Sequence, residues 1–150
     1  MQRSISDKKS ITPFVYVVIF TVYIGLSSIY LFLPPLLAVL FVLFTKAIKS
    51  EDIIAIFLVS LCLVIFEAEK GYTLFSTIIY FTILYKFIMP RLAQNSNCSS
   101  CIRIFTILFT YIGFFIFSLL LSNVFLLSYP SMNYYIIYYI VIEFFILSLM

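Results

Sequence analysis

Two long stretches of this chain carry no charged side chain, and their length limits what the chain can fold into. They run from Ser10 to Thr45 and from Ile104 to Ile142. As helices that rise about 1.5 Å per residue, each would extend about 50 Å or more, whereas the hydrocarbon core of a bilayer is about 30 Å thick. Each stretch must therefore fold back on itself, and each contains helix-breaking proline, at 34–35 in the first and at Pro130 in the second. The pattern predicts a chain that crosses a membrane several times.

The composition points the same way. Apolar residues make up 65% of the 150 residues and charged residues 10%, whereas soluble domains have about 25% charged residues. A soluble fold of this size cannot bury so much apolar side chain, so we expect lipid to solvate much of it. We expect residues 1–12 to form a cytoplasmic N-terminal tail, and residues 13–150 to form a single polytopic membrane domain.

Six apolar segments can be drawn between the polar residues. Because lipid permits only helices or closed barrels, and barrel alternation is absent, we expect an all-α integral membrane protein, a bundle of about six transmembrane helices. The segments cover residues 13–33, 34–48, 53–66, 72–89, 102–127 and 134–150. Thr12 is the expected N-cap of the first segment, and Pro90 is expected to end the fourth. Segments two and three are short, and the sequence leaves open whether they cross fully or whether the third extends through Glu67 to Lys70.

Basic residues gather on one side of this predicted topology. Lys70 is the one basic residue on the other side, beside Glu67 and Glu69. Because lysine and arginine accumulate in cytoplasmic loops, we expect both termini to be cytoplasmic. This topology accounts for the basic residues, so we expect membrane lipid and no nucleic acid as a partner. The residues on the predicted cytoplasmic side are Arg3, Lys8, Lys9, Lys46, Lys49, Lys86, Arg91 and Arg103.

Glu143 is the one carboxylate inside a predicted span. An ionised carboxylate at that depth costs roughly 2.5 kcal/mol or more, so its side chain should face other helices, water or a partner. Two interpretations stay open. Glu143 is either a functional coupling or partner contact, or it forms a hydrogen bond within the bundle to Ser118, Ser122 or Asn123.

Glu67, Lys70 and Gly71 belong to the densest polar cluster of the predicted outer side. Glu67 and Lys70 are three residues apart, so they can pair on one face of a helix. Gly71 suits the turn that ends a helix. The cluster is either a solvated cap at the membrane interface or part of a ligand site.

No catalytic or metal-binding constellation is visible. Histidine is absent, which removes the usual general base and the commonest metal ligand. Cys98 and Cys101 have CxxC spacing, but a zinc site needs four ligands and the third cysteine, Cys62, lies within an apolar segment. We therefore expect no metal, no cofactor and no enzymatic activity.

The layout resembles the rod shape-determining protein MreD family of bacteria, most clearly over residues 34–92. In that family a proline opens the second segment, a short third segment ends near an acidic residue, and a glycine precedes the fourth. Pro34 or Pro35, Glu67 and Gly71 are similar to these positions. The resemblance implies a non-enzymatic scaffold of the cell-elongation and peptidoglycan-synthesis machinery in the bacterial cytoplasmic membrane. Its partners would be MreC-like and MreB-like proteins and peptidoglycan synthases.

A second resemblance is one of architecture alone. The substrate-binding components of energy-coupling vitamin transporters are also compact bundles of about six helices with irregular lengths. They bind their ligand in an outward-facing cavity. This resemblance implies, as the alternative, a substrate-binding membrane component of a small-molecule transporter.

Overall fold

The computed structural model describes residues 4–95, 97–128 and 134–149, with the side chains of α1 described from Phe14 onward. These residues are predominantly helical and contain no strand, which confirms the all-α prediction. Two pairs of helices are each joined end to end through a π-helical turn, η1 or η2, into one continuous rod. The elements are α1 (Ser4–Ile29), α2 (Leu37–Lys49), α3 (Ile53–Lys70), then α4 (Ser76–Ile83), η1 (Leu84–Ile88) and α5 (Met89–Asn95) as one rod, then α6 (Ser99–Leu108), η2 (Phe109–Gly113) and α7 (Phe114–Phe125) as another, and α8 (Tyr135–Leu149).

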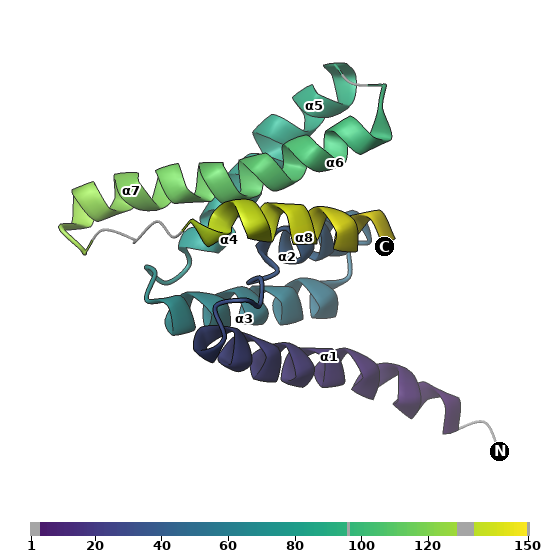
Figure 1. Ribbon diagram of the computed structural model, residues 1–150. Coiled ribbons are helices and arrows are strands. Elements are labelled where there is room, and N and C mark those ends of the chain that lie inside the picture. The colour runs from purple at the N-terminus through teal and green to yellow at the C-terminus, as the bar shows by residue number, and fades with distance from the viewer. Residues whose placement is uncertain (1–3, 96, 129–133, 150) are drawn as a thin grey trace.

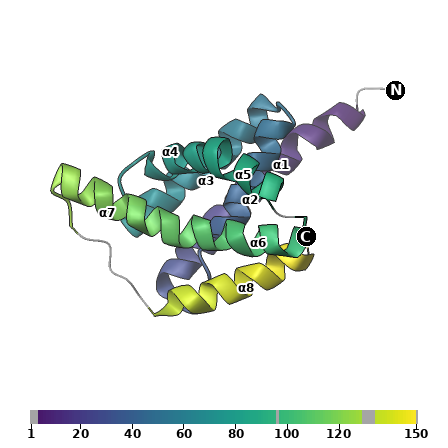
Figure 2. The same ribbon diagram turned by 90° about the horizontal axis from the view of Figure 1, so that it is seen from above.

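Successive rods run back and forth, so their ends gather at two ends of the bundle (Figure 1). One end holds the start of α1, the α2–α3 and α5–α6 connections and the end of α8. The opposite end holds the α1–α2 and α3–α4 connections, the end of α7 and the start of α8, and the view from above agrees (Figure 2). We call the first the basic end, because Lys46 and Lys49 lie in the last turn of α2 there. The predicted turn at Pro130 and the basic residue Arg3 lie outside the described residues.

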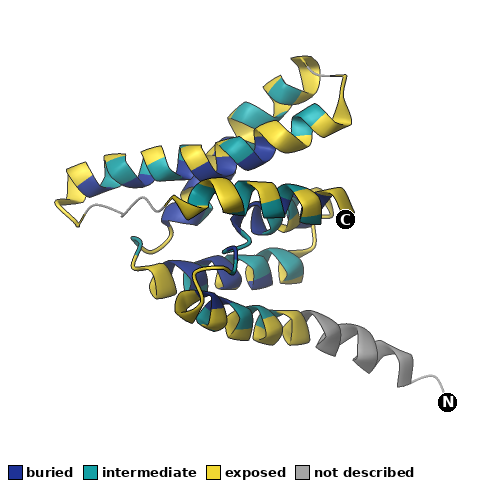
Figure 3. Cartoon of the chain, viewed as in Figure 1, coloured by how far each residue is buried: buried dark blue, intermediate teal, exposed yellow. Residues whose placement is uncertain are grey.

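The centre of the bundle is α2. It contacts α3, η2 and α8, and most of its side chains are buried. The ring of Phe41 meets the ring of Phe81 edge to face, with 5.1 Å between their centroids, and both side chains are fully buried. Buried residues face inward along each rod, and exposed residues cover the outside (Figure 3). The bundle thus has one core, closed around α2.

Several predicted helix boundaries were wrong. Helix α1 begins at Ser4, so Thr12 is not its N-cap and Pro13 lies inside it. The fourth helix does not end at Pro90, because the rod continues through α5 to Asn95. Pro90 lacks the N–H that would bond the carbonyl four residues before it, and the π-turn η1 lies directly ahead of it, where the bonding pattern has shifted. The third helix does extend to Lys70, as the sequence allowed.

The second π-turn, η2, is supported by a tyrosine of α4. The hydroxyl of Tyr80 donates a hydrogen bond to the carbonyl oxygen of Phe109, at 2.5 Å. A Cβ placed on Gly113 would clash with that hydroxyl. A side chain at position 113 would therefore displace the Tyr80 hydroxyl from its hydrogen bond to Phe109.

Helix length identifies one membrane-crossing candidate among the described residues. The continuous rod Ser99–Phe125 has 27 residues and a mean hydropathy of 2.4, enough to cross a bilayer. Phe14–Ile29 and Tyr135–Leu149 are also apolar but shorter. Helix α2 is shorter again, about 20 Å by its rise per residue, against a hydrocarbon core of about 30 Å.

Candidate functional site

Glu67, in the last turn of α3, is fully buried and points at the first turn of α4. One carboxylate oxygen accepts from the Thr77 amide at 2.5 Å, the Thr77 hydroxyl at 2.6 Å and the Ser76 hydroxyl at 3.0 Å. The other accepts from the amide of Phe75 at 2.6 Å. The N-cap of α4 is Phe75, which has no polar side chain to satisfy the free amides of that turn. Glu67 performs the capping instead, and its negative charge suits the positive end of the helix dipole.

The outcome for the polar cluster around Glu67 is mixed. Gly71 lies at the C-cap of α3 with φ of 71°, and its amide donates to the carbonyl of Glu67, as expected for a helix-ending turn. The interpretation of the cluster as a solvated cap is wrong for Glu67, because the side chain of Glu67 is fully buried. The spacing allowed the Glu67 carboxylate to pair with Lys70, but that carboxylate accepts hydrogen bonds from donors at the start of α4.

Glu143, in α8, is the second fully buried carboxylate. It accepts a hydrogen bond from the backbone amide of Ala38 at 2.7 Å and another from the hydroxyl of Tyr111. The N-cap of α2 is Leu36, so this helix also begins without a polar capping side chain. Glu143 therefore caps α2 from the neighbouring helix α8.

The partners of Glu143 differ from those considered in the sequence. Ser122 donates to the carbonyl of Leu127, and the buried hydroxyl of Ser118 has no hydrogen-bond partner among the described residues. The signal for the true partner was indirect. An apolar N-cap at Leu36 leaves the amides of α2 in need of an acceptor, but the sequence does not show which acceptor reaches them.

No metal site is formed by the part of the chain that the structure describes, in which no group of three or more ligating side chains occurs. Cys98 and Cys101 lie at the start of α6, on the surface, while Cys62 is buried in α3. The hydrogen bond between the two surface thiols lowers the pKa of Cys98. These cysteines form a local pair with no histidine or carboxylate beside them among the described residues.

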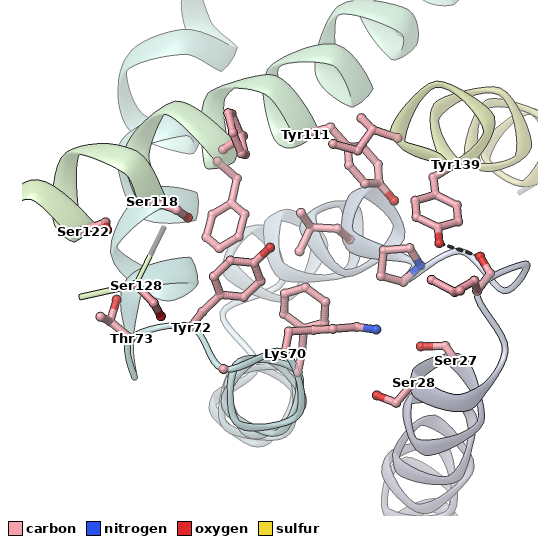
Figure 4. Close-up of a pocket in the computed structure, with 18 of the residues that line it drawn as sticks. Ser27, Ser28, Lys70, Tyr72, Thr73, Tyr111, Ser118, Ser122, Ser128 and Tyr139 are labelled. Carbon is pink, nitrogen blue, oxygen red and sulfur yellow. Dashed lines mark hydrogen bonds between the residues drawn. The ribbon is translucent and has the colours of Figure 1, made fainter. Parts of the chain in front are cut away.

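A cavity of 470 Å³ lies at the end of the bundle opposite the basic end, among the ends of α1, α3, α7 and α8 (Figure 4). Aromatic rings form much of its wall, and hydroxyl groups are spread around it. The polar side chains that line it are Ser27, Ser28, Lys70, Tyr72, Thr73, Tyr111, Ser118, Ser122, Ser128 and Tyr139. Its polar residues come from segments that are far apart in the sequence, so their meeting could not be predicted from local patterns.

Among the described residues that line the cavity, Lys70 is the single one with a charged side chain. Its ammonium group extends into the cavity toward Ser27 and Ser28 (Figure 4). Lys70 is exposed, and the negative charge of Glu69 lies near its ammonium group. The rim is fixed by hydrogen bonds, since the hydroxyl of Tyr139 donates to the carbonyl of Leu31 at 2.6 Å.

Comparison with protein-family models, with curated proteins and with solved structures finds no match to this chain.

Proposed function

We propose that the chain is a multi-pass protein of the bacterial cytoplasmic membrane, with both termini in the cytoplasm, and that it acts as a non-enzymatic scaffold of the cell-elongation machinery. The observation that supports the membrane topology best is the distribution of charge between the two ends of the bundle. Lys46, Lys49 and Arg103 lie toward the basic end, whereas Lys70 lies at the other. Such a distribution is what the positive-inside rule requires of a bundle whose ends face opposite sides of a membrane.

The outward faces of the helices support the same proposal. Val18 and Val22 of α1, Leu120 of α7 and Ile137 and Phe145 of α8 are each more than half exposed. In water, an apolar surface spread over so many helices would drive aggregation, whereas lipid solvates it at no cost. The short helices α2 and α8 then lie in a locally thinner bilayer or end at its polar interface.

The buried polar groups favour a scaffold over an enzyme or a proton-coupled carrier. Both buried carboxylates already accept hydrogen bonds from helix starts, Glu67 from α4 and Glu143 from α2. Groups occupied in this way hold helices in place and are poorly suited to exchanging protons or attacking a substrate. The assignment of the scaffold to the elongation machinery rests on the resemblance of residues 34–92 to the MreD family. Its proposed partners are MreC-like and MreB-like proteins and peptidoglycan synthases.

Reporter fusions test the topology. Fusions after Lys49, at Asn97 and at the C-terminus should report the cytoplasm, and fusions at Gly71 and Ser128 should report the outside. An external Asn97 would contradict a six-crossing topology, because α4–α5 and α6–α7 would then enter the membrane from the wrong side.

Depletion and affinity purification test the scaffold. Cells depleted of the protein should lose their rod shape, and the tagged protein should carry wall-elongation proteins with it from gently solubilised membranes. The matched control is the Glu67→Leu variant, which should lose these partners if an intact bundle presents their binding surface. Rod shape retained on depletion, with no elongation protein recovered, would rule the scaffold out.

The cavity favours a second candidate, a substrate-binding membrane component of a small-molecule transporter. Its volume of 470 Å³ and its mixture of aromatic and hydroxyl side chains suit a small organic ligand. Under this proposal the purified protein would carry an energising ATPase and retain a small molecule. Recovery of elongation proteins in place of the ATPase would favour the scaffold.

A further inference from the structure

We propose that the cavity binds a small organic monocarboxylate with a flat apolar body, and that Lys70 holds the carboxylate. This deepens the second candidate function by naming the class of ligand, and it does not depend on the scaffold. It rests on three features of the cavity, which are its charge, its aromatic wall and an unsatisfied hydroxyl group.

The charge of the cavity selects an anion. Among the described residues, Lys70 is the one charged residue of the lining, and it presents its positive charge to the cavity. Glu69, the nearest carboxylate in sequence, accepts a hydrogen bond from the hydroxyl of Ser28 at 3.4 Å. Among the described residues the Lys70 ammonium has neither a hydrogen bond nor an ion pair. A single carboxylate on the ligand would neutralise it, and a dianion would leave one charge uncompensated in a partly desolvated site.

The wall of the cavity selects an apolar, flat body. Phe66 and Tyr72 stack with 6.1 Å between their ring centroids, and Tyr72 meets Phe114 edge to face at 5.1 Å. All three rings line the cavity, and Phe115 joins them from α7. A planar group can pack against these faces and edges, with the geometry that aromatic pairs prefer.

Ser118 supplies the polar contact at the far side. Ser118 lines the cavity, and within the described part of the chain its buried hydroxyl has no hydrogen-bond partner. A buried hydroxyl without a partner is uncommon in folded proteins and is costly, so a ligand that offers one acceptor or donor there would satisfy it. In Figure 4, Tyr72 lies between Ser118 and the Lys70 ammonium, so a ligand that engages both groups must extend past the ring of Tyr72.

The test uses the full chain in detergent micelles and measures binding by isothermal calorimetry. The probes are 2-naphthoate, the neutral 2-naphthylmethanol as its matched control, and palmitate as a carboxylate that comes from lipid. We expect 2-naphthoate to bind the wild type at least about tenfold more tightly than the alcohol, the factor that a hydrogen bond to a charged group typically gives.

The variants assign that difference to the site. Lys70→Met should weaken 2-naphthoate about tenfold or more without changing the affinity for the alcohol, and Lys70→Arg should retain most of it. Lys86→Met, which removes a lysine outside the cavity lining, should change nothing. Ser118→Leu, which fills the cavity without touching the charge, should weaken both naphthyl probes. Lys70 is exposed, and the Ser118 hydroxyl has no hydrogen-bond partner in the described part of the chain, so neither substitution removes a hydrogen bond from the fold.

Equal affinity for 2-naphthoate and the alcohol, or naphthoate binding that survives Lys70→Met, would overturn the proposal. Tight binding of palmitate alone would also overturn it, in favour of a lipid-filled cavity. These outcomes leave the fusion and co-purification results untouched, because Lys70→Met alters neither the basic end nor the outer helix faces. An ATPase that co-purifies while 2-naphthoate fails to bind would keep the transporter component and reject this ligand class.

Discussion

Helices α4 and α2 both begin without a polar capping side chain, and a glutamate caps each of them. The two glutamates differ in how far along the sequence they lie from the helix that they cap. Each helix begins after an apolar residue in left-handed backbone, Phe75 with φ of 67° and Leu36 with φ of 55°. Each is capped by a fully buried glutamate from another helix. Glu67 lies 8 to 10 residues from its donors, whereas Glu143 lies 105 residues from Ala38.

The difference in range implies a difference in role. The Glu67 cap closes within one helical hairpin, α3 and α4, and can form as soon as those two helices meet. The Glu143 cap needs α8, α2 and the hydroxyl of Tyr111 together, so it exists only in the assembled bundle. The first cap shapes a local turn, and the second fixes how the last helix docks on the central one.

Removing the local cap should have the largest effect. Glu67→Leu leaves two backbone amides and two hydroxyls without their acceptor, and we expect the free energy of unfolding to fall by about 3 kcal/mol. Detergent-induced unfolding followed by circular dichroism measures it. Glu69→Leu, which removes an exposed carboxylate of the same turn, is the control and should have little effect. Equal losses in the two variants would show that Glu67 is not the cap.

Removing the long-range cap should cost less and act differently. Glu143→Leu should lower the free energy of unfolding by about 1–2 kcal/mol, the range for hydrogen bonds between membrane helices. It should also loosen α8, which limited proteolysis detects as earlier cleavage near the C-terminus. Tyr111→Phe, which keeps the contact to Ala38, should show a smaller loss of the same kind. Unchanged proteolysis of α8 would contradict the docking role.

The two left-handed N-caps should respond differently to glycine. Glycine removes the backbone strain of about 1 kcal/mol that a non-glycine residue bears there, at some cost in unfolded-state entropy. Phe75 is 57% exposed, so Phe75→Gly should raise the free energy of unfolding by about 0.5 kcal/mol. Leu36 is partly buried, so Leu36→Gly should be close to neutral. Destabilisation by Phe75→Gly would show that its ring stabilises the turn.

The cysteine pair at the start of α6 belongs to neither cap and should have the smallest effect. Replacing Cys98 and Cys101 together with serine should leave folding and function unchanged. Because the hydrogen bond to Cys101 lowers the pKa of Cys98, its thiolate forms at lower pH than that of an ordinary thiol. Maleimide labelling of Cys98 should therefore begin at lower pH in the wild type than in Cys101→Ser. Loss of function in the double variant, or zinc in the purified protein, would reveal a role for the pair.

The sequence predicts the parts of this fold that depend on local patterns. Apolar segments predicted the helices in their order, and Gly71 marked a helix end, because both signals lie within a few residues. The continuation past Pro90 was missed, since it depends on a π-turn that no residue type encodes. The caps were missed because Glu143 meets Ala38 only after the whole bundle has assembled. The cavity was not predicted for the same reason, because Lys70 and Ser118 come from separate helices.

The most direct test of the two caps compares two glutamines. In Glu67→Gln, either orientation of the amide turns its NH₂ group toward a backbone N–H, of Phe75 or of Thr77, which can only donate. In Glu143→Gln, the carbonyl can accept from Ala38 while the NH₂ group donates to the hydroxyl of Tyr111, which can also accept.

The measurement is the free energy of unfolding of these two variants beside the wild type, by detergent titration of the purified full chain. Glu67→Gln should lose about 1–3 kcal/mol, the cost of one buried donor without its acceptor, and Glu143→Gln should stay within about 0.5 kcal/mol of the wild type. Equal stability of the two variants, or a larger loss in Glu143→Gln, would contradict the assignment of both glutamates as helix caps.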